Sequence, residues 1–260
     1  MGGDVLPGAT MELYDSEGNA VKDADGNAVT WESGEEPKDI GPYLTAGESY
    51  VLKETAAPDG FAVVTDIGFT VDETGKVTVD KATTTGKSYI DEDTGFLVVE
   101  DAPLTLKINK TDLGGTVLEG ATMELYESDG TTPVKDADGK AVTWTSGSEP
   151  KDIGPYLVGG ETYVLKETAA PTGYEVVTDI TFTIDETGKV TLAETNTTGE
   201  SEIDENGFLV VKDSPLELKI NKTDLGGTVL EGATMELYES DGKTPVKDAD
   251  GNAVTWTSGS

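Results

Sequence analysis

The strongest constraint on the fold of this chain is a repeat with a period of 112 residues. The heptapeptide GATMELY begins at Gly8, Gly120 and Gly232, so equal steps of 112 residues separate its copies. A unit of about one hundred residues is long enough to bury a core of its own, whereas the short repeats of a solenoid share one core. The chain is therefore expected to be an array of globular domains.

The repeat divides the chain into three expected segments. Residues 104–215 form a copy in which every part of the pattern is present, and residues 1–103 lack the strand that opens this copy. Residues 216–260 carry that opening strand and the first part of a third copy. Two explanations of these ends are open. Either the chain is a window on a longer stalk, or the tail of one chain supplies the missing strand to the head of the next.

Within each copy the sequence alternates as β-strands do, and helical periodicity is almost absent. The segments ATMELYE, KAVTWT, ETYVLKE, DITFTID, KVTLAE and GFLVVKD of the middle copy are rich in β-branched and aromatic residues. Turn dipeptides such as Asp138-Gly139 and Asn206-Gly207 separate them. This spacing predicts an all-β fold of tandem immunoglobulin-like antiparallel β-sandwich domains.

The composition excludes several classes of function. Acidic residues outnumber basic ones by 51 to 18, which gives a formal net charge of −33, and the chain has no Arg, His, Gln or Cys. Without His or Cys there is no histidine-based nucleophile pair, no zinc site of the usual kind and no disulfide, and we expect no metal and no cofactor. So much negative charge predicts no nucleic-acid partner and no contact of this segment with a membrane, and no apolar run is long enough to span a bilayer.

The opening strand of the repeat carries a lysine where its apolar face should continue. In LTLKINKTD, the side chains of Leu104, Leu106, Ile108 and Lys110 share one face, and LELKINKTD repeats this arrangement with Lys222. A buried ammonium group costs several kcal/mol unless it is paired, neutralised or chemically consumed. Both lysines therefore need a partner or a reaction.

Two acidic residues in each copy occupy similar positions. In ETYVLKET of the middle copy the apolar face ends at Glu167, and in GFLVVKD it ends at Asp213; the first copy repeats these with Glu54 and Asp101. One explanation is a buried ion pair or triad, and another is that the strand ends meet solvent. The third is that Lys, Glu and Asp form a reactive set.

A reactive set of this kind would form an amide bond. Burial raises the pKa of carboxyl groups and lowers that of amines, so a neutral amine can meet a neutral acid. The lysine nitrogen would attack the carbonyl carbon of the aspartate, and water would leave. Glu167 would move the protons as general acid and base. The first event would consume the set, so we expect no turnover enzyme.

Four motifs carry a resemblance to a known family. INKTD, GATMELYESDG, YVLKETAAPTGYEVVTDITFTIDETGKVT and FLVVKD resemble the collagen-adhesin B-type (Cna B-like or SpaA-like) domains of Gram-positive surface adhesins and pilins. The resemblance is strongest to a streptococcal fibronectin-binding-protein domain from which a split tag and catcher were made. It implies a prealbumin-like sandwich and a spontaneous isopeptide bond between a lysine of the first strand and an Asp or Asn of the last, assisted by a glutamate of the ETAAP segment. By motif the lysine corresponds to Lys110 and Lys222, the glutamate to Glu54 and Glu167, and the acceptor to Asp101 and Asp213.

The resemblance also implies a role. It favours a structural stalk, spacer or fibre-forming repeat of an extracellular bacterial surface protein, anchored to the cell wall in the full-length protein. One bond is expected within the chain, from Lys110 to Asp213. Lys222 and Asp101 would join neighbouring chains head to tail if the second explanation of the ends holds, so the expected partners are other repeats or copies of the chain. The alternative function is an adhesin module that binds a host matrix protein or a glycan.

Three further features of the sequence bear on its chemistry. Lys107 is a rival nucleophile, but the alternation points it outward with Thr105. The run from Asp23 to Asn27 could suggest calcium, yet it lacks a ligand that an EF-hand loop needs before its glycine, so it is predicted to be a turn. The segment from Asp136 to Tyr156 is longer than expected for the family, and the resemblance gives it no role.

Overall fold

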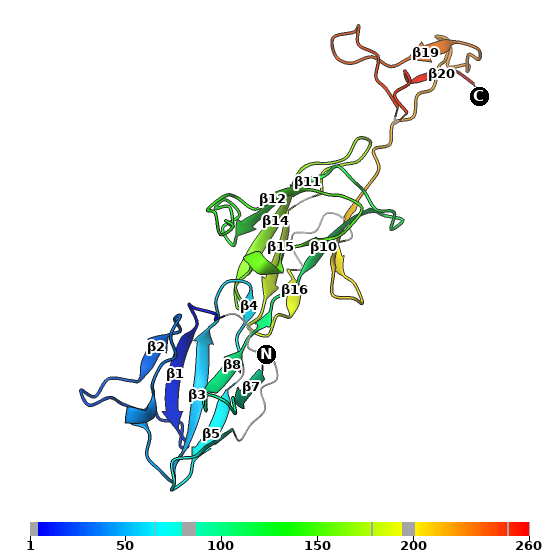
Figure 1. The fold of residues 1–260 in the computed structure, drawn as a ribbon. Coiled ribbons are helices and arrows are strands. Elements are labelled where there is room, and N and C mark those ends of the chain that lie inside the picture. Colours follow the sequence, from blue (N-terminus) through cyan, green and yellow to red (C-terminus); the bar gives the residue numbers. More distant parts are fainter. Residues whose placement is uncertain are drawn as a thin grey trace. The chain divides into compact units, whose positions relative to one another are not determined.

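The structure is a computed structural model that describes residues 5–64, 66–79, 87–177, 179–193, 201–248 and 250–259. The chain divides into two compact units, residues 1–215 and 216–260, and the larger unit contains two separate hydrophobic cores, one for each of the first two copies of the repeat. Strands dominate both copies (Figure 1), and helical structure in the described ranges is limited to the 3-10 turns η1 (Gly41–Tyr43) and η2 (Gly154–Tyr156). The predicted all-β fold is confirmed.

The first copy is built from a five-stranded sheet and a two-stranded sheet. Its strands are β1 (Thr10–Asp15), β2 (Thr30–Glu32), β3 (Ser49–Ala56), β5 (Ile67–Val71), β6 (Val77–Val79), β7 (Lys87–Ile90) and β8 (Leu97–Glu100). The larger sheet has the order β2-β1-β3-β5-β6, and the smaller one pairs β7 with β8. Alternate residues of β1, β3 and β5 face inward. Leu13, Leu52 and Phe69 are among them, and they are buried in a core that also contacts β8.

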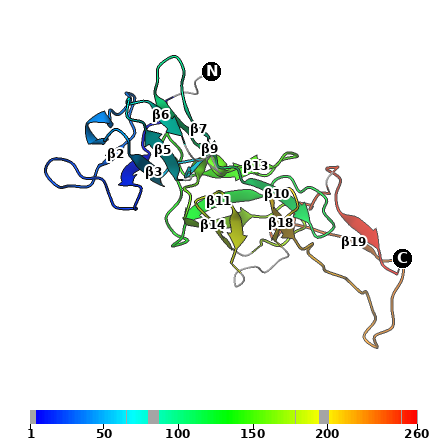
Figure 2. The same ribbon diagram turned by 90° about the horizontal axis from the view of Figure 1, so that it is seen from below.

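The second copy has the same five-stranded sheet and a larger opposite sheet (Figure 2). Its strands are β10 (Lys107–Asp112), β11 (Thr122–Glu127), β12 (Thr143–Thr145), β13 (Lys151–Asp152), β14 (Thr162–Ala169), β15 (Ile180–Ile184), β16 (Val190–Leu192), β17 (Glu202–Ile203) and β18 (Leu209–Asp213). The sheets have the orders β12-β11-β14-β15-β16 and β13-β10-β18-β17.

One strand pair differs from the predicted antiparallel arrangement. The first strand β10 and the last strand β18 of the second copy run parallel, with Ile108 opposite Leu209 and Lys110 opposite Val211. A parallel pair needs a long crossover instead of a hairpin, and here the crossover is the rest of the domain. The parallel register places the inward residues of both strands in neighbouring positions.

Backbone contacts join the two copies of the larger unit. The short strands β4 (Phe61–Ala62) and β9 (Ala102–Pro103) pair, and Ala62 is buried in the core of the second copy. The Gly60 N–H donates to Leu157 O at 2.7 Å, and Gly60 O accepts the Leu104 N–H at 2.7 Å. Gly60 has φ +84°, and a Cβ there would lie 3.1 Å from the backbone of Pro155, so this close approach requires glycine.

In the smaller unit, the prediction of a strand over residues 216–224 is wrong. The unit contains the pair β19 (Thr234–Glu236) and β20 (Thr255–Thr257), whereas residues 216–224 form only an isolated bridge from Thr223 to Val229. A strand needs neighbours that supply hydrogen bonds and cover its apolar face. The described part of this unit offers no counterpart of β18.

Candidate functional site

Three ionisable side chains meet in the core of the second copy. Lys110 lies on β10 and Asp213 on the adjacent β18, while Glu167 lies on β14 of the opposite sheet. The three residues are only 3%, 1% and 4% exposed. The burial predicted from strand alternation is confirmed for all three.

Local sequence and strand register together place these side chains. Leu106 and Ile108 precede Lys110 on the buried face of the first strand, and Val211 precedes Asp213 on the buried face of the last. Because Lys110 is opposite Val211, Asp213 is the next inward residue along β18 and lies diagonally beside the lysine. On the opposite sheet, a register shift in the β11–β14 pair lies next to Glu167.

The three groups are partners chiefly of one another. Lys110 Nζ contacts Asp213 Oδ1 and lies 3.5 Å from Glu167 Oε1. Within the described structure, Lys110 Nζ, Glu167 Oε1 and both Asp213 carboxylate oxygens are buried without a hydrogen-bond partner outside this trio. Buried polar atoms normally find partners, so this cluster calls for either a compact ion triad or a covalent bond.

The second oxygen of Glu167 is held by the backbone. Glu167 Oε2 accepts the Val177 N–H at 2.8 Å. Burial raises the pKa of Glu167 and the nearby Asp213 carboxyl raises it further, while the Val177 N–H and the Lys110 ammonium lower it. The net effect is a raised pKa of Glu167, so this residue can hold a proton at a higher pH than an exposed glutamate. This property suits a group that must both accept and donate a proton.

Sequence reasoning missed the role of the Val177 N–H. The first copy repeats this contact, with the Val64 N–H donating to Glu54 Oε2 at 2.5 Å across the same separation of ten residues. A backbone donor has no side-chain signature, so the residue pattern carries no signal for this hydrogen bond.

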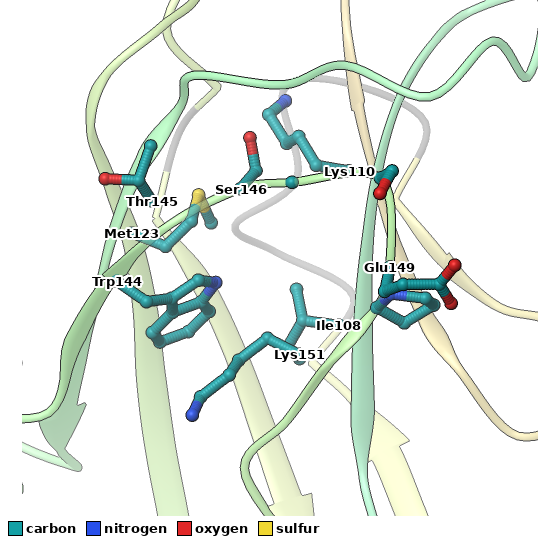
Figure 3. Close-up of a pocket in the computed structure, with 11 residues that line it drawn as sticks. Ile108, Lys110, Met123, Trp144, Thr145, Ser146, Glu149 and Lys151 are labelled. Carbon is teal, nitrogen blue, oxygen red and sulfur yellow. The ribbon is translucent and has the colours of Figure 1, made fainter.

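A pocket of about 330 Å3 adjoins the lysine (Figure 3). Ile108, Lys110 and Met123 line one part of it, and residues 144–151 line the rest. Within the described residues, no group of three or more acidic, His or Cys side chains is arranged to hold a metal ion.

The long segment from Asp136 to Tyr156 acquires a structural role. Its strand β13 pairs with the outer edge of β10, with Lys107 opposite Asp152 and Ile108 opposite Lys151. The Ile153 N–H also donates to Leu106 O at 2.8 Å. The segment therefore covers the free edge of the strand that carries Lys110.

Two other sequence predictions are confirmed. Lys107 is exposed, with its Nζ 5.3 Å from the centre of the Phe208 ring. The acidic run that begins at Asp23 forms a turn, in which Asp23 Oδ1 accepts the N–H groups of Asp25 and Asn27 at 2.9 Å. Separately, none of the helices in the described ranges is long and apolar enough to cross a bilayer.

In the first copy the structure brings together two acidic residues. Glu54 is 6% exposed on β3, and Asp101, which follows β8, is half-buried. Burial and the neighbouring Asp101 raise the pKa of Glu54 to about 7, and burial raises the pKa of Asp101. No ammonium group lies within ion-pair distance of either residue in the described part of the chain.

The remaining predicted lysine lies in the smaller unit. Lys222 is half-buried, and its backbone O accepts the Leu230 N–H at 2.8 Å. The three apolar residues that precede it on the same face of the motif are exposed, which contrasts with their burial in the second copy.

Comparisons with known proteins identify relatives of the chain. The family model described as SpaA, prealbumin-like fold domain, matches residues 1–85 and 104–198. None of the curated proteins compared with the chain matches it.

Several solved structures are similar to the chain. The C-terminal fragment of pilus adhesin SpaC from Lactobacillus rhamnosus GG is 22% identical, with 82% of this chain and 91% of that chain covered and a TM-score of 0.35. The shaft pilin SpaA from the same bacterium is 16% identical, with 83% and 90% covered and a TM-score of 0.29. The Bacillus anthracis TIE protein is 21% identical, with 98% and 41% covered and a TM-score of 0.30.

Proposed function

Because the chain belongs to the SpaA prealbumin-like fold domain family, we propose that it is a structural repeat of a bacterial surface protein of the pilus or adhesin type. In this proposal an amide bond between Lys110 and Asp213 stabilises the second copy, and the chain acts as a stalk or fibre segment outside the cell. The observation that carries the proposal is the buried contact of Lys110 Nζ with Asp213 Oδ1, with Glu167 Oε1 at 3.5 Å.

A covalent bond accounts for this cluster better than a permanent ion triad does. One ammonium and two carboxylates in an apolar core leave an excess negative charge, and each buried ion carries a desolvation penalty of several kcal/mol. Condensation of Lys110 with Asp213 removes two of the three charges. It leaves Glu167, whose Oε2 keeps its hydrogen bond to the Val177 N–H.

The reaction balances without a cofactor. The neutral amine of Lys110 attacks Cγ of protonated Asp213, so that an N–C bond forms and the bond from Cγ to the hydroxyl oxygen breaks. Glu167 Oε1 accepts a proton from the attacking nitrogen and returns one to the departing hydroxyl, which leaves as water. The apolar core disfavours the reverse hydrolysis. Each site reacts once, so we propose no turnover activity.

The position of the bond suits a load-bearing element. It would connect the first and last strands of the copy, which lie side by side in parallel. Tension that enters at β10 and leaves at β18 would then pass through the amide and bypass most of the domain. Only residues 214 and 215 separate β18 from the next copy of the opening motif, so the linker between successive copies would be very short.

The intact mass of the denatured chain tests the proposal. We expect the unmodified chain to be lighter than its calculated mass by one water, and tandem mass spectrometry to find a branched peptide that links Lys110 to Asp213. Glu167→Ala should restore the full mass for its sequence. Lys107→Ala is the matched control and should keep the loss of water, because Lys107 is exposed. A full-mass chain without the branched peptide would refute the bond.

A further inference from the structure

Strand alternation does not fix the position of β10 along its own axis. The inward residues of this part of the second copy are Leu104, Leu106, Ile108 and Lys110. A slip by one residue would turn every side chain to the other face, whereas a slip by two keeps the same face inward. Each residue advances about 3.3 Å along a strand, so a slip by two would move Lys110 about 7 Å relative to Asp213. The proposed bond therefore needs a further contact that sets the register.

The first copy makes a contact of this kind just before β10. The Leu104 N–H, three residues ahead of β10, donates to Gly60 O of the first copy at 2.7 Å. The Gly60 N–H in turn donates to Leu157 O of the second copy at 2.7 Å. Gly60 thus connects two segments of the second copy, the one that leads into β10 and the one that follows η2.

The second copy holds Leu104 closely from the other side. This residue is 2% exposed, and a Cβ at Gly188 would lie 3.1 Å from Leu104 Cδ2. A Cβ at Gly154 would clash with the backbone of Leu104, and the Ile153 N–H donates to Leu106 O at 2.8 Å. With so little free space around it, Leu104 fits at one position along the strand axis.

The segment around Gly60 is itself fixed between the two cores. Its strand β4 pairs with β9 and lies where the two copies meet (Figure 1). Ala62 is buried in the core of the second copy, and the Val63 N–H donates to Glu186 O of that copy at 3.1 Å. The next residue, Val64, is buried in the core of the first copy. Because the segment belongs to both cores, the folded first copy holds Gly60 in place.

We propose that contact with the first copy sets the register of β10, with Gly60 as the positioning residue that brings Lys110 beside Asp213. The inference rests on the amide bond proposed between these two residues. It adds an order of events, because a folded copy would speed cross-linking in the copy that follows it. The loop that carries Gly60 recurs in the second copy with Gly173, so each copy offers the same contact to its successor.

Two glycines of the first copy form a matched pair for testing the contact. Gly60 and Gly18 both have φ +84°, so alanine imposes similar backbone strain at either position. A Cβ at Gly60 would lie 3.1 Å from the backbone of Pro155 in the second copy, whereas a Cβ at Gly18 meets no atom within 4 Å. Only Gly60→Ala therefore pushes the two copies apart.

Pulse-chase cell-free synthesis of the 260-residue chain measures the rate of cross-linking. Chains are denatured at intervals and their intact mass is recorded, so that the loss of one water reports the Lys110–Asp213 bond. Gly60→Ala should slow this loss roughly tenfold, which is the scale expected when two backbone hydrogen bonds are lost. Gly18→Ala should react at the rate of the unmodified chain.

Val63→Pro perturbs the same contact without straining Gly60. Proline lacks the N–H that donates to Glu186 O, and the extended conformation of Ala62 in β4 is compatible with a following proline. This variant should also slow the loss of water. If Gly60→Ala fails to fold, the rate of Val63→Pro decides the question.

Amide hydrogen exchange distinguishes a local loss of register from general unfolding. The Leu104 N–H should exchange faster in both variants than in the unmodified chain, because its acceptor Gly60 O is displaced. The Leu125 N–H, which donates to Val142 O within the second copy, should remain protected. Slow cross-linking together with rapid exchange at Leu125 would mean unfolding of the second copy, and would overturn the positioning role.

The remaining outcomes separate this inference from the proposed bond. Unchanged rates of water loss in both Gly60→Ala and Val63→Pro would overturn the role of the first copy and leave the bond in place. A chain that keeps its full mass without any substitution would refute the bond, and the inference with it.

Discussion

Glu167→Gln offers the sharpest test of how the proposed bond stabilises the second copy. Glutamine has nearly the same size as glutamate, and its side-chain oxygen can still accept the Val177 N–H, but it cannot relay a proton. Lys110 and Asp213 should then remain unbonded in the same core. The variant therefore removes the covalent link while most of the packing is retained.

The expected loss of stability follows from the loop that the bond closes. The loop runs from residue 110 to residue 213, and the chain-entropy relation for cross-links gives roughly 4.7 kcal/mol for a loop of about one hundred residues. One kcal/mol shifts the Tm of a domain of this size by roughly 4–8 °C, so the Tm of the second copy should fall by roughly 20 °C or more.

Differential scanning calorimetry of the full chain, paired with intact mass, measures this effect. Glu54→Gln is the matched control, since it alters the equivalent residue of the first copy and should leave the transition of the second copy unchanged. If Glu167→Gln lacks the bond by mass and yet melts at the temperature of the unmodified chain, the loop-closure argument is wrong.

Three further results are expected. The pKa of Glu54 is about 7 in the folded first copy and near the ordinary value of 4.5 in the unfolded chain, so the folded state retains a proton that the unfolded state releases. The stability of the first copy, measured by urea unfolding, should therefore fall as pH rises from about 4.5 to 7 by on the order of 2–3 kcal/mol, and Glu54→Gln should flatten this dependence. Gly154→Ala should destabilise the second copy by roughly 1–3 kcal/mol because its Cβ would clash with the backbone of Leu104, whereas Gly147→Ala, which meets no atom within 4 Å, should change the urea midpoint little. An Asp213→Ala chain should keep its full calculated mass, and retention of the water loss in that variant would place the bond elsewhere.

Strand alternation was a reliable guide to the candidate site in the second copy. It placed Lys110, Glu167 and Asp213 on buried faces, and the structure buries each of them. Alternation is reliable there because both sheets are covered on one face, so successive side chains must point alternately into the core and outward. A shift by one residue would turn every apolar side chain outward.

The same reasoning was wrong for residues 216–224 and only partly right for β8. Ile220 is 52% exposed although its counterpart Ile108 is 3% exposed, and Val99 is half-buried although Val211 is 0% exposed. Burial is a property of neighbouring strands as well as of the pattern along one strand. A sequence motif can specify an apolar face, but it cannot provide the strand that covers it.

The residue pattern alone establishes the repeat, the all-β class and the identity of the three ionisable residues, because period and polarity are local properties of a chain. Tertiary structure decides which strands become neighbours. The parallel register of β10 and β18 brings Lys110 to Asp213, and the opposite sheet supplies Glu167 with the Val177 N–H that holds it. These contacts join residues up to 103 positions apart, and such distances are set by the packing of two sheets around one core.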